Sequence, residues 1–264
     1  MLAVTVHVLS RLGQRLGAAA QATGASIAPL LSTARCALRL QVTPHEILRQ
    51  THAQIVRSFL FVGVGNFCIG FVFALSLGHQ LELFNLEIRT VGVLTVATVQ
   101  TLGPIFTGLL LSGRVASGLA AEIGAMQRTE QLTAMRALSL DAEALLIAPR
   151  VIAVALGCVV LTLVADALTL CGGALVMLST FDMLPHTFFA RCADELRAGD
   201  VLTSATKALV FGLLIGGIGC AAGLREKKGT AQVGEDTKSA VVAASFSILV
   251  ANVLLTRFFL WLYP

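Results

Sequence analysis

Charged residues are unusually few in this sequence. Only 13% of its 264 residues are Asp, Glu, Lys or Arg, whereas 56% are hydrophobic. An ordinary soluble domain carries about 25% charged residues, so this composition excludes one. The apolar residues gather in long uncharged runs, and a run of roughly 20 helical residues crosses a hydrocarbon core of about 30 Å. The sequence therefore predicts an all-α integral membrane protein.

Motifs for catalysis and for metal binding are also missing. The nearest pattern to a phosphate loop, residues 229–234, continues with Glu235 and Asp236 where Lys and Ser or Thr are required. These two carboxylates would repel a phosphate. The six cysteines are scattered singly, without a CxxC pair or a histidine at metal-ligand spacing. We expect no enzyme, no metal and no cofactor, and the net charge of +4 does not suggest a nucleic-acid partner.

Five apolar runs predict five transmembrane helices. They cover residues 58–77, 91–113, 144–178, 201–224 and 239–263. Residues 1–56 mix apolar positions with arginines and have no long apolar run, which favours an amphipathic helix at the membrane interface. They also lack the pattern of a cleaved signal peptide. The expected organisation is this interfacial segment, residues 1–56, followed by a five-helix membrane domain, residues 57–264.

Lysine and arginine are distributed unevenly between the two sides of the predicted membrane domain. With a cytoplasmic N-terminus, 14 of these residues fall on the inside and 5, including Lys207, on the outside. Positive residues concentrate on the cytoplasmic side of membrane proteins. We therefore expect a cytoplasmic N-terminus and a C-terminus on the outer side.

Several residues inside the predicted spans have more than one interpretation. Asp166 is either a functional group that faces the bundle interior or a residue near the outer interface whose carboxylate reaches water. Pro104 removes a backbone hydrogen bond, so it predicts either a kink that lines a cavity or a packed break. The polar side chain of Gln100 can bond to backbone or to a neighbouring helix. Gly70 and Ala74 lie four residues apart, which is typical of closely packed membrane helices.

The connection between the second and third spans is too charged to lie in lipid. We expect a cytoplasmic helix over about residues 122–143. Within it, Leu132, Met135 and Leu138 recur at three-residue spacing and form a narrow apolar stripe. Both a helix that docks into the groove of a partner and an ordinary loop helix have this pattern.

Residues 102–153 contain, in order and without gaps, Leu-Gly-Pro, Gly-Arg followed by small residues, Ala-Glu-Ile-Gly, Thr-Glu-Gln-Leu and Pro-Arg. This stretch resembles the MlaE/YrbE family of permeases, the membrane subunits of ABC transporters that serve MCE-type lipid-binding proteins. A second block, residues 207–224 and 229–256, resembles the last two helices of the family.

The resemblance implies a homodimer of five-helix permease subunits that moves phospholipid to or from a periplasmic MCE-domain protein. Two separate cytoplasmic ATPase subunits would supply the energy. The expected location is the inner membrane of a bacterium rather than the inner envelope of a plastid.

The resemblance also implies two sets of functional residues. The ATPase would contact the coupling residues Arg128, Thr129, Glu130, Gln131 and Leu132. Phospholipid would contact the lipid-binding residues Phe73, Gln80, Leu81, Phe84, Gln100, Thr101 and Leu102. Many relatives have Arg-Glu where this chain has Gln100-Thr101, so neutral polar groups replace a charged pair. Residues 234–238, Gly-Glu-Asp-Thr-Lys, also depart from the family pattern.

Two functions of other classes stay open. A secondary transporter driven by an ion gradient would need titratable groups in the pathway and inverted repeats, for which Asp166 is the only sequence support. A membrane scaffold that anchors the ATPase without transporting anything would fit the neutral Gln100-Thr101 pair.

Overall fold

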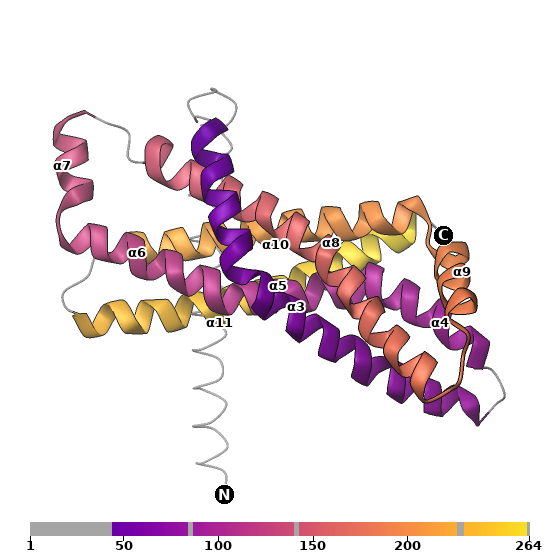
Figure 1. The fold of residues 1–264 in the computed structure, drawn as a ribbon. Helices are drawn as coiled ribbons and strands as arrows, with labels where there is room; N and C mark the ends of the chain where they lie inside the picture. Colours follow the sequence, from indigo (N-terminus) through magenta and orange to yellow (C-terminus); the bar gives the residue numbers. More distant parts are fainter. Residues whose placement is uncertain (1–43, 84–86, 140–142, 226–229, 263–264) are drawn as a thin grey trace, which may run out of the picture. The chain divides into compact units, whose positions relative to one another are not determined.

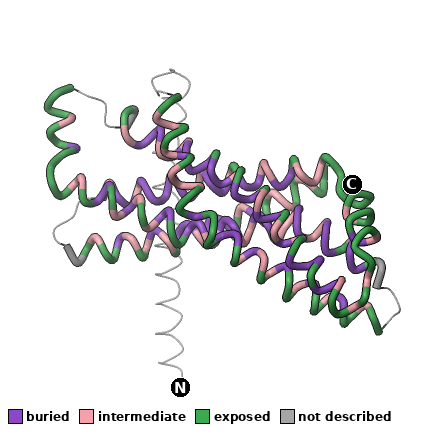
Figure 2. The backbone as a smooth tube through the Cα atoms, viewed as in Figure 1, coloured by how far each residue is buried: buried purple, intermediate pink, exposed green. Residues whose placement is uncertain are grey.

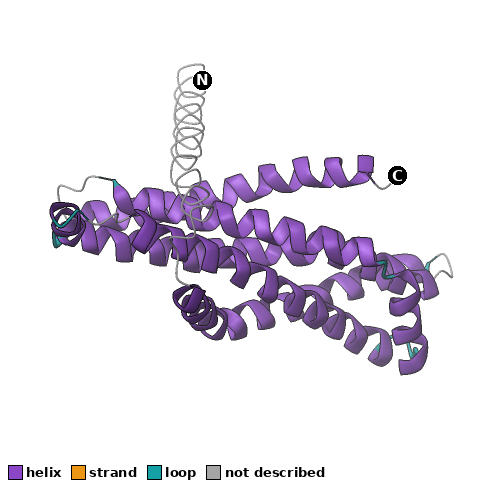
Figure 3. Cartoon of the chain, turned by 90° about the horizontal axis from the view of Figure 1, so that it is seen from above, coloured by secondary structure: helices purple, strands orange, loops and turns teal. Residues whose placement is uncertain are grey.

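The computed structural model describes residues 44–83, 87–139, 143–225 and 230–262, and these residues form helices with short connections and no strand (Figures 1 and 3). Within the described residues, the first α-helix is α3, Pro44–Glu82, followed by α4, Glu87–Ala97. The remaining α-helices are α5 (Gly103–Leu111), α6 (Ser117–Arg128), α7 (Gln131–Ala137), α8 (Ala148–Ser179), α9 (Pro185–Glu195), α10 (Ala198–Leu224) and α11 (Thr230–Leu262). Three π-helical segments interrupt or precede them, namely η1 (Thr98–Leu102), η2 (Ser112–Ala116) and η3 (Glu143–Ile147).

Within the described residues, five helical stretches are long and apolar enough to cross a membrane. They are Pro44–Glu82, Arg89–Arg128, Leu145–Ser179, Ala198–Leu224 and Gln232–Leu262. The prediction of an all-α membrane protein with five spans is confirmed. Residues 1–43, which hold most of the expected interfacial helix, lie outside the described residues.

The helix bounds differ from the sequence expectation at two ends. Residues 44–56 belong to the same helix as the first span, because α3 begins at Pro44, and proline is well suited to the first turn of a helix. The charged residues Glu122 and Arg128 likewise lie on α6, which continues the second span. Charge marks where a helix leaves lipid, but it does not by itself end the helix.

The expected helix over residues 122–143 is divided in two. α6 ends at Arg128, Glu130 has a left-handed backbone with a φ of 57°, and α7 begins at Gln131. A non-glycine residue in this conformation is uncommon, and here it turns the chain between the two helices. A further helix, α9, lies in the polar connection between the third and fourth spans, where the hydropathy pattern predicts no span.

The chain divides into two compact units. Unit 1 comprises Met1–Gln50, Ser112–Val154 and Leu213–Ser247, and unit 2 comprises Thr51–Leu111, Ala155–Gly212 and Ile248–Pro264. In unit 1, a core cluster joins α6, α7, η3, α8 and α10 through Ile123, Leu132, Ile147, Val151 and Cys220.

The core of unit 2 is built from α3, α4, α8 and α9. Leu94, Met177 and Phe188 are its largest buried side chains. α3 and α8 approach closely, because a Cβ atom on Gly70 would overlap the carbonyl oxygen of Thr169. The small-residue spacing of the first span thus corresponds to a close helix contact. Figure 2 shows this pattern of burial, with buried positions along the packed helices and mostly exposed residues on α7 and α9.

Candidate functional site

An apolar pocket lies along α3 in unit 2 and has a volume of about 470 Å³. It is lined by Phe73, Ser76, Leu77, Gln80 and Leu81 of α3 and by Val93 of α4. Residues spaced by three or four positions share one face of a helix, which explains how α3 supplies five of these side chains. Gly70, Ala74 and Gly78, which are buried, occupy the packed side of the same helix.

The polar groups at this pocket are few. The Ser76 hydroxyl donates to the backbone carbonyl of Val72 at 2.9 Å, so its hydrogen is used within the helix. The amide of Gln80 is exposed at the pocket. An apolar cavity with a small number of polar groups is the usual composition of a small-molecule site.

Three of the predicted lipid-binding residues, Phe73, Gln80 and Leu81, therefore line one pocket. Sequence reasoning missed Leu77, although it lies four residues from both Phe73 and Leu81 and the helical period could have found it. Phe84, also predicted to contact lipid, lies outside the described residues.

The other predicted lipid-binding residues, Gln100, Thr101 and Leu102, lie on the π-helical segment η1 and are half-buried. They are not among the residues that line the pocket. The Gln100 amide instead donates to the carboxylate of Asp200 on α10, with an Nε2 to Oδ1 distance of 2.7 Å. This is the bond to a neighbouring helix that the sequence left as one alternative.

Asp166 is buried within unit 2 and does not reach the surface. It is 5% exposed, and its Oδ2 atom accepts a hydrogen bond from Ser204 at 2.8 Å. Its Oδ1 atom lies against Gly103, where a Cβ atom would overlap it. The interpretation as a carboxylate that reaches water at the interface is therefore wrong, because α10 and the glycine of span two enclose the group.

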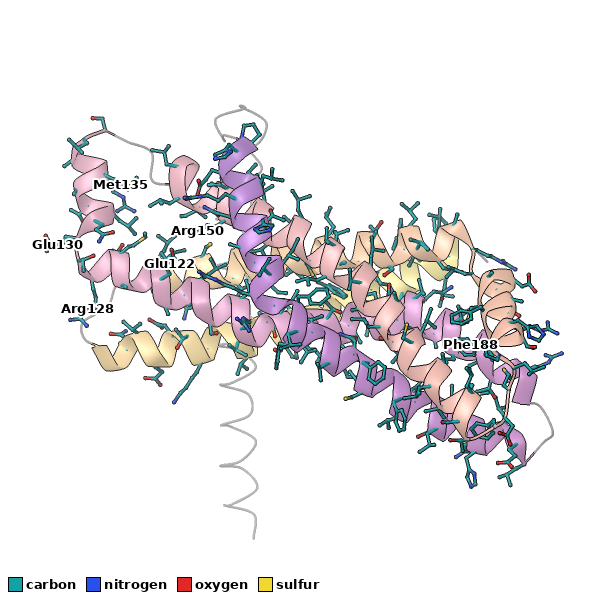
Figure 4. All side chains as sticks on the ribbon, in the orientation of Figure 1. Glu122, Arg128, Glu130, Met135, Arg150 and Phe188 are labelled. Atoms are coloured by element: carbon teal, nitrogen blue, oxygen red, sulfur yellow. The ribbon has the colours of Figure 1, made fainter. Side chains whose placement is uncertain are left out.

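The predicted coupling residues surround the turn between α6 and α7 in unit 1 (Figure 4). Four of them are exposed, namely Arg128, Thr129, Glu130 and Gln131. Leu132 is only 2% exposed and belongs to the core of unit 1, with Met135 packed against the same cluster. The apolar stripe is thus split, because its third member, Leu138, is 72% exposed.

One ion pair ties α6 to α8 in unit 1. The Arg150 guanidinium donates to the Glu122 carboxylate at 2.7 Å, and the two labelled side chains face each other in Figure 4. The Arg150 side chain is 10% exposed, whereas that of Glu122 is 55% exposed. Both residues lie in the motifs that carry the family resemblance, but nothing in those motifs indicates that they pair.

Over the part of the chain that the structure describes, no group of three or more His, Cys, Asp or Glu side chains could hold a metal ion. Five apolar spans and a pocket bounded by two of them define a multi-pass membrane protein with a ligand-sized apolar site.

Comparison with known proteins identifies the family. The family model described as Permease MlaE matches residues 47–258, and the chain belongs to this family. The chain is similar to a probable ABC transporter permease protein of Rickettsia bellii, with 35% identity over 213 residues that cover 78% of this chain and 82% of the relative. A probable ABC transporter permease protein of Synechocystis is 34% identical over 71% of this chain and 72% of the relative.

A third relative is the protein TRIGALACTOSYLDIACYLGLYCEROL 1, chloroplastic, of Arabidopsis thaliana. It is 32% identical over 72% of this chain and 55% of its own length. With the family established, the chain is a membrane permease subunit of the ABC-transporter type, and such a subunit implies a separate ATPase partner.

Proposed function

We propose that this permease subunit moves phospholipid between the inner membrane of a bacterium and a periplasmic MCE-domain protein. It works as a homodimer, with ATP hydrolysis in separate cytoplasmic subunits. The observation that carries the proposal is the apolar pocket on α3. An acyl chain that enters the pocket from the bilayer is already in apolar surroundings, so its packing against the side chains of the pocket, rather than its removal from water, favours binding.

The pocket residues have different roles in this proposal. Phe73, Leu77 and Leu81 offer an apolar surface to an acyl chain, and the Gln80 amide offers a hydrogen bond to the ester or headgroup region. Gln100, Thr101 and Leu102 lie outside the pocket and contact the part of the lipid that extends beyond it. The name of the Arabidopsis relative refers to a glycerolipid, which supports a lipid as the transported molecule.

Filling the pocket tests the proposal. Ser76→Trp places an indole in the cavity, whereas Val72→Trp makes the same change on α3 at a residue that is 60% exposed and does not line the pocket. Each variant complex is reconstituted in proteoliposomes, and ATP-driven transfer of phospholipid to the MCE-domain protein is measured. We expect transfer to fall about tenfold or more in Ser76→Trp, the equivalent of at least one lost contact of about 1.4 kcal/mol, and to stay unchanged in Val72→Trp. Equal transfer by both variants would exclude this pocket from the lipid pathway.

The exposed coupling residues form the proposed ATPase contact. Glu130→Gly removes a side chain from that surface and keeps the left-handed turn, since glycine adopts a positive φ without strain. Asp182→Gly is a matched control, because Asp182 is also acidic, exposed and left-handed, with a φ of 48°, and lies in a connection that we expect on the outer side. We expect only Glu130→Gly to uncouple ATP hydrolysis from lipid transfer.

Leu132 is also a proposed coupling residue, but its side chain is buried in the core of unit 1. A substitution there alters the packing of α7 together with the ATPase contact. The exposed residues Arg128, Thr129 and Gln131 therefore give the clearer functional test.

Three further measurements address the partners and the class of transporter. Lipid that co-purifies with the complex, identified by mass spectrometry, distinguishes a permease from a scaffold that binds none. Transfer that continues without ATP and stops with a protonophore would indicate the secondary transporter. An alkaline phosphatase fused to the C-terminus is active only in the periplasm, so its activity tests the proposed orientation.

A further inference from the structure

The break in the second span involves two consecutive irregularities of the backbone. The N–H of Gly103 donates to the carbonyl of Thr98, five residues earlier, which is the π-helical pattern. In an α-helix, the carbonyl of Gln100 would accept a hydrogen bond from the N–H of residue 104. That residue is Pro104, which has no N–H, so the Gln100 carbonyl cannot receive its α-helical hydrogen bond.

A side chain from another span supplies a donor to this carbonyl. The ammonium of Lys207 on α10 lies 2.6 Å from the carbonyl oxygen of Gln100 and donates to it. The same ammonium donates to the hydroxyl of Thr256 on α11, at 2.8 Å. One side chain thus connects three spans at the point where the second span loses its regular hydrogen bonding. All of these residues belong to unit 2.

The surroundings of Lys207 indicate a hydrogen-bonding role. The residue is 1% exposed, and no carboxylate of the described residues forms an ion pair with its ammonium. A charged group at this depth is costly unless it is well hydrogen-bonded, and here its acceptors are a backbone carbonyl and a hydroxyl. A lysine that only filled space could be replaced by an apolar side chain without loss.

We propose that Lys207 is a positioning residue that replaces the α-helical N–H missing at Pro104. Its bond to the Gln100 carbonyl holds the break in the second span and so fixes the segment that carries Gln100, Thr101 and Leu102. Because the donor comes from α10, the geometry of η1 depends on how α10 lies against it. This inference rests on the proposed function, in which those three residues contact lipid.

The bond between Lys207 and Gln100 gives a specific suppression test. Lys207→Met keeps the length of the side chain and removes the donor, and Pro104→Ala returns an N–H to the helix. If Lys207 substitutes for that N–H, Pro104→Ala will suppress the defect of Lys207→Met. A lysine with any other structural role would give additive defects, because Pro104→Ala would not repair them.

Thermal unfolding of the purified complex in detergent is the first readout. We expect Lys207→Met to lower the Tm by about 5 °C, because a buried carbonyl loses its donor, and the double variant to recover at least half of that shift. Lys238→Met, the same change at an exposed lysine of α11, should leave the Tm unchanged. If Lys207→Met alone does not fold, recovery of folded protein in the double variant gives the same result. A double variant no better than Lys207→Met overturns the proposal.

ATP-driven phospholipid transfer, normalised to ATPase activity, is the second readout. We expect this ratio to fall about tenfold in Lys207→Met and to recover in the double variant, since misplacing a binding segment weakens transfer without removing the ATPase site. A ratio unchanged in Lys207→Met overturns the positioning role. Suppression of the Tm defect in a complex that transfers no phospholipid at all would instead refute the proposed cargo and leave the bond between Lys207 and Gln100 established.

Discussion

Two charged residues of unit 1, Glu122 and Arg150, are held differently from two of unit 2, Asp166 and Lys207. In unit 1, the partly exposed Glu122 and Arg150 form an ion pair at 2.7 Å. In unit 2, Asp166 and Lys207 are almost fully buried and bond to neutral groups, among them the hydroxyl of Ser204. Ion pairs near water are worth little because solvent screens them, whereas a buried charge depends on every hydrogen bond that it makes. Removing a buried charged group of unit 2 should therefore lower the free energy of unfolding more than removing an exposed one at the surface of unit 1.

Space around glycine differs between Gly70 of unit 2 and Gly113 of unit 1. A Cβ atom on Gly70 would overlap a carbonyl oxygen of the neighbouring helix. A Cβ atom on Gly113 would have no atom of the described residues within 4 Å. The close helix contact at Gly70 therefore leaves no room for an added group, whereas Gly113 has room for one.

The largest effect is expected at Gly70. Gly70→Ala forces α3 away from α8, and we expect a loss of about 3 kcal/mol or more in the free energy of unfolding. Gly113→Ala is the matched control in unit 1 and should leave stability unchanged or raise it by up to about 1 kcal/mol, because alanine favours a helix. Thermal unfolding in detergent measures both. Similar destabilisation by the two variants would contradict the difference in packing between Gly70 and Gly113.

Leu132 comes next, because it is the buried member of an apolar stripe whose end is exposed. Leu132→Ala should cost about 2–3 kcal/mol through lost packing in the core of unit 1. Leu138→Ala makes the same change at a residue that is 72% exposed and should cost little. Proteolysis of α7 together with thermal unfolding compares them. Equal stability of the two variants would mean that Leu132 does not anchor α7.

Asp166 should have an intermediate effect. Asp166→Ala leaves the buried Ser204 hydroxyl without its acceptor, and we expect a loss of about 1–2 kcal/mol. Asp166→Asn keeps a carbonyl oxygen for Ser204 and should cost less. Chemical denaturation of the purified protein measures which of the two variants is less stable. If Asp166→Asn were as destabilising as Asp166→Ala, the negative charge itself would be required.

The smallest effect is expected for the ion pair between Glu122 and Arg150. A double-mutant cycle with Glu122→Gln and Arg150→Gln should give a coupling of about 0.5 kcal/mol, because the Glu122 side chain is 55% exposed. This coupling should decrease as salt is raised from about 0.1 M to 1 M, since the screening length falls from about 10 Å to 3 Å. A coupling that is large and independent of salt would place this pair with the buried charges of unit 2.

Local patterns carried most of the fold prediction. Apolar runs located all five spans, since the length of apolar sequence needed to cross a membrane is a property of consecutive residues. The same hydropathy pattern could not find α9, because that amphipathic helix is short and polar overall. It also separated residues 44–56 from the first span, because a helix can continue unchanged from water into lipid.

The candidate site was only partly predictable. The family resemblance drew attention to Phe73, Gln80 and Leu81, which the structure brings to one pocket. Composition could not separate the buried Leu132 from the exposed Leu138, because both have the same side chain and the same helical spacing. The charge count placed Lys207 on the outer side, whereas the structure buries it within α10.

By itself, the sequence determined that this protein is a five-span helical membrane protein of a recognisable permease family. Both hydropathy and contiguous motifs depend only on residues that are close together in the sequence. Only the tertiary structure decided the partners of its buried polar groups. Gln100 bonds to Asp200, Asp166 to Ser204, and Lys207 to the backbone carbonyl of Gln100. These contacts join residues from 38 to 107 positions apart, and their existence depends on how the helices pack.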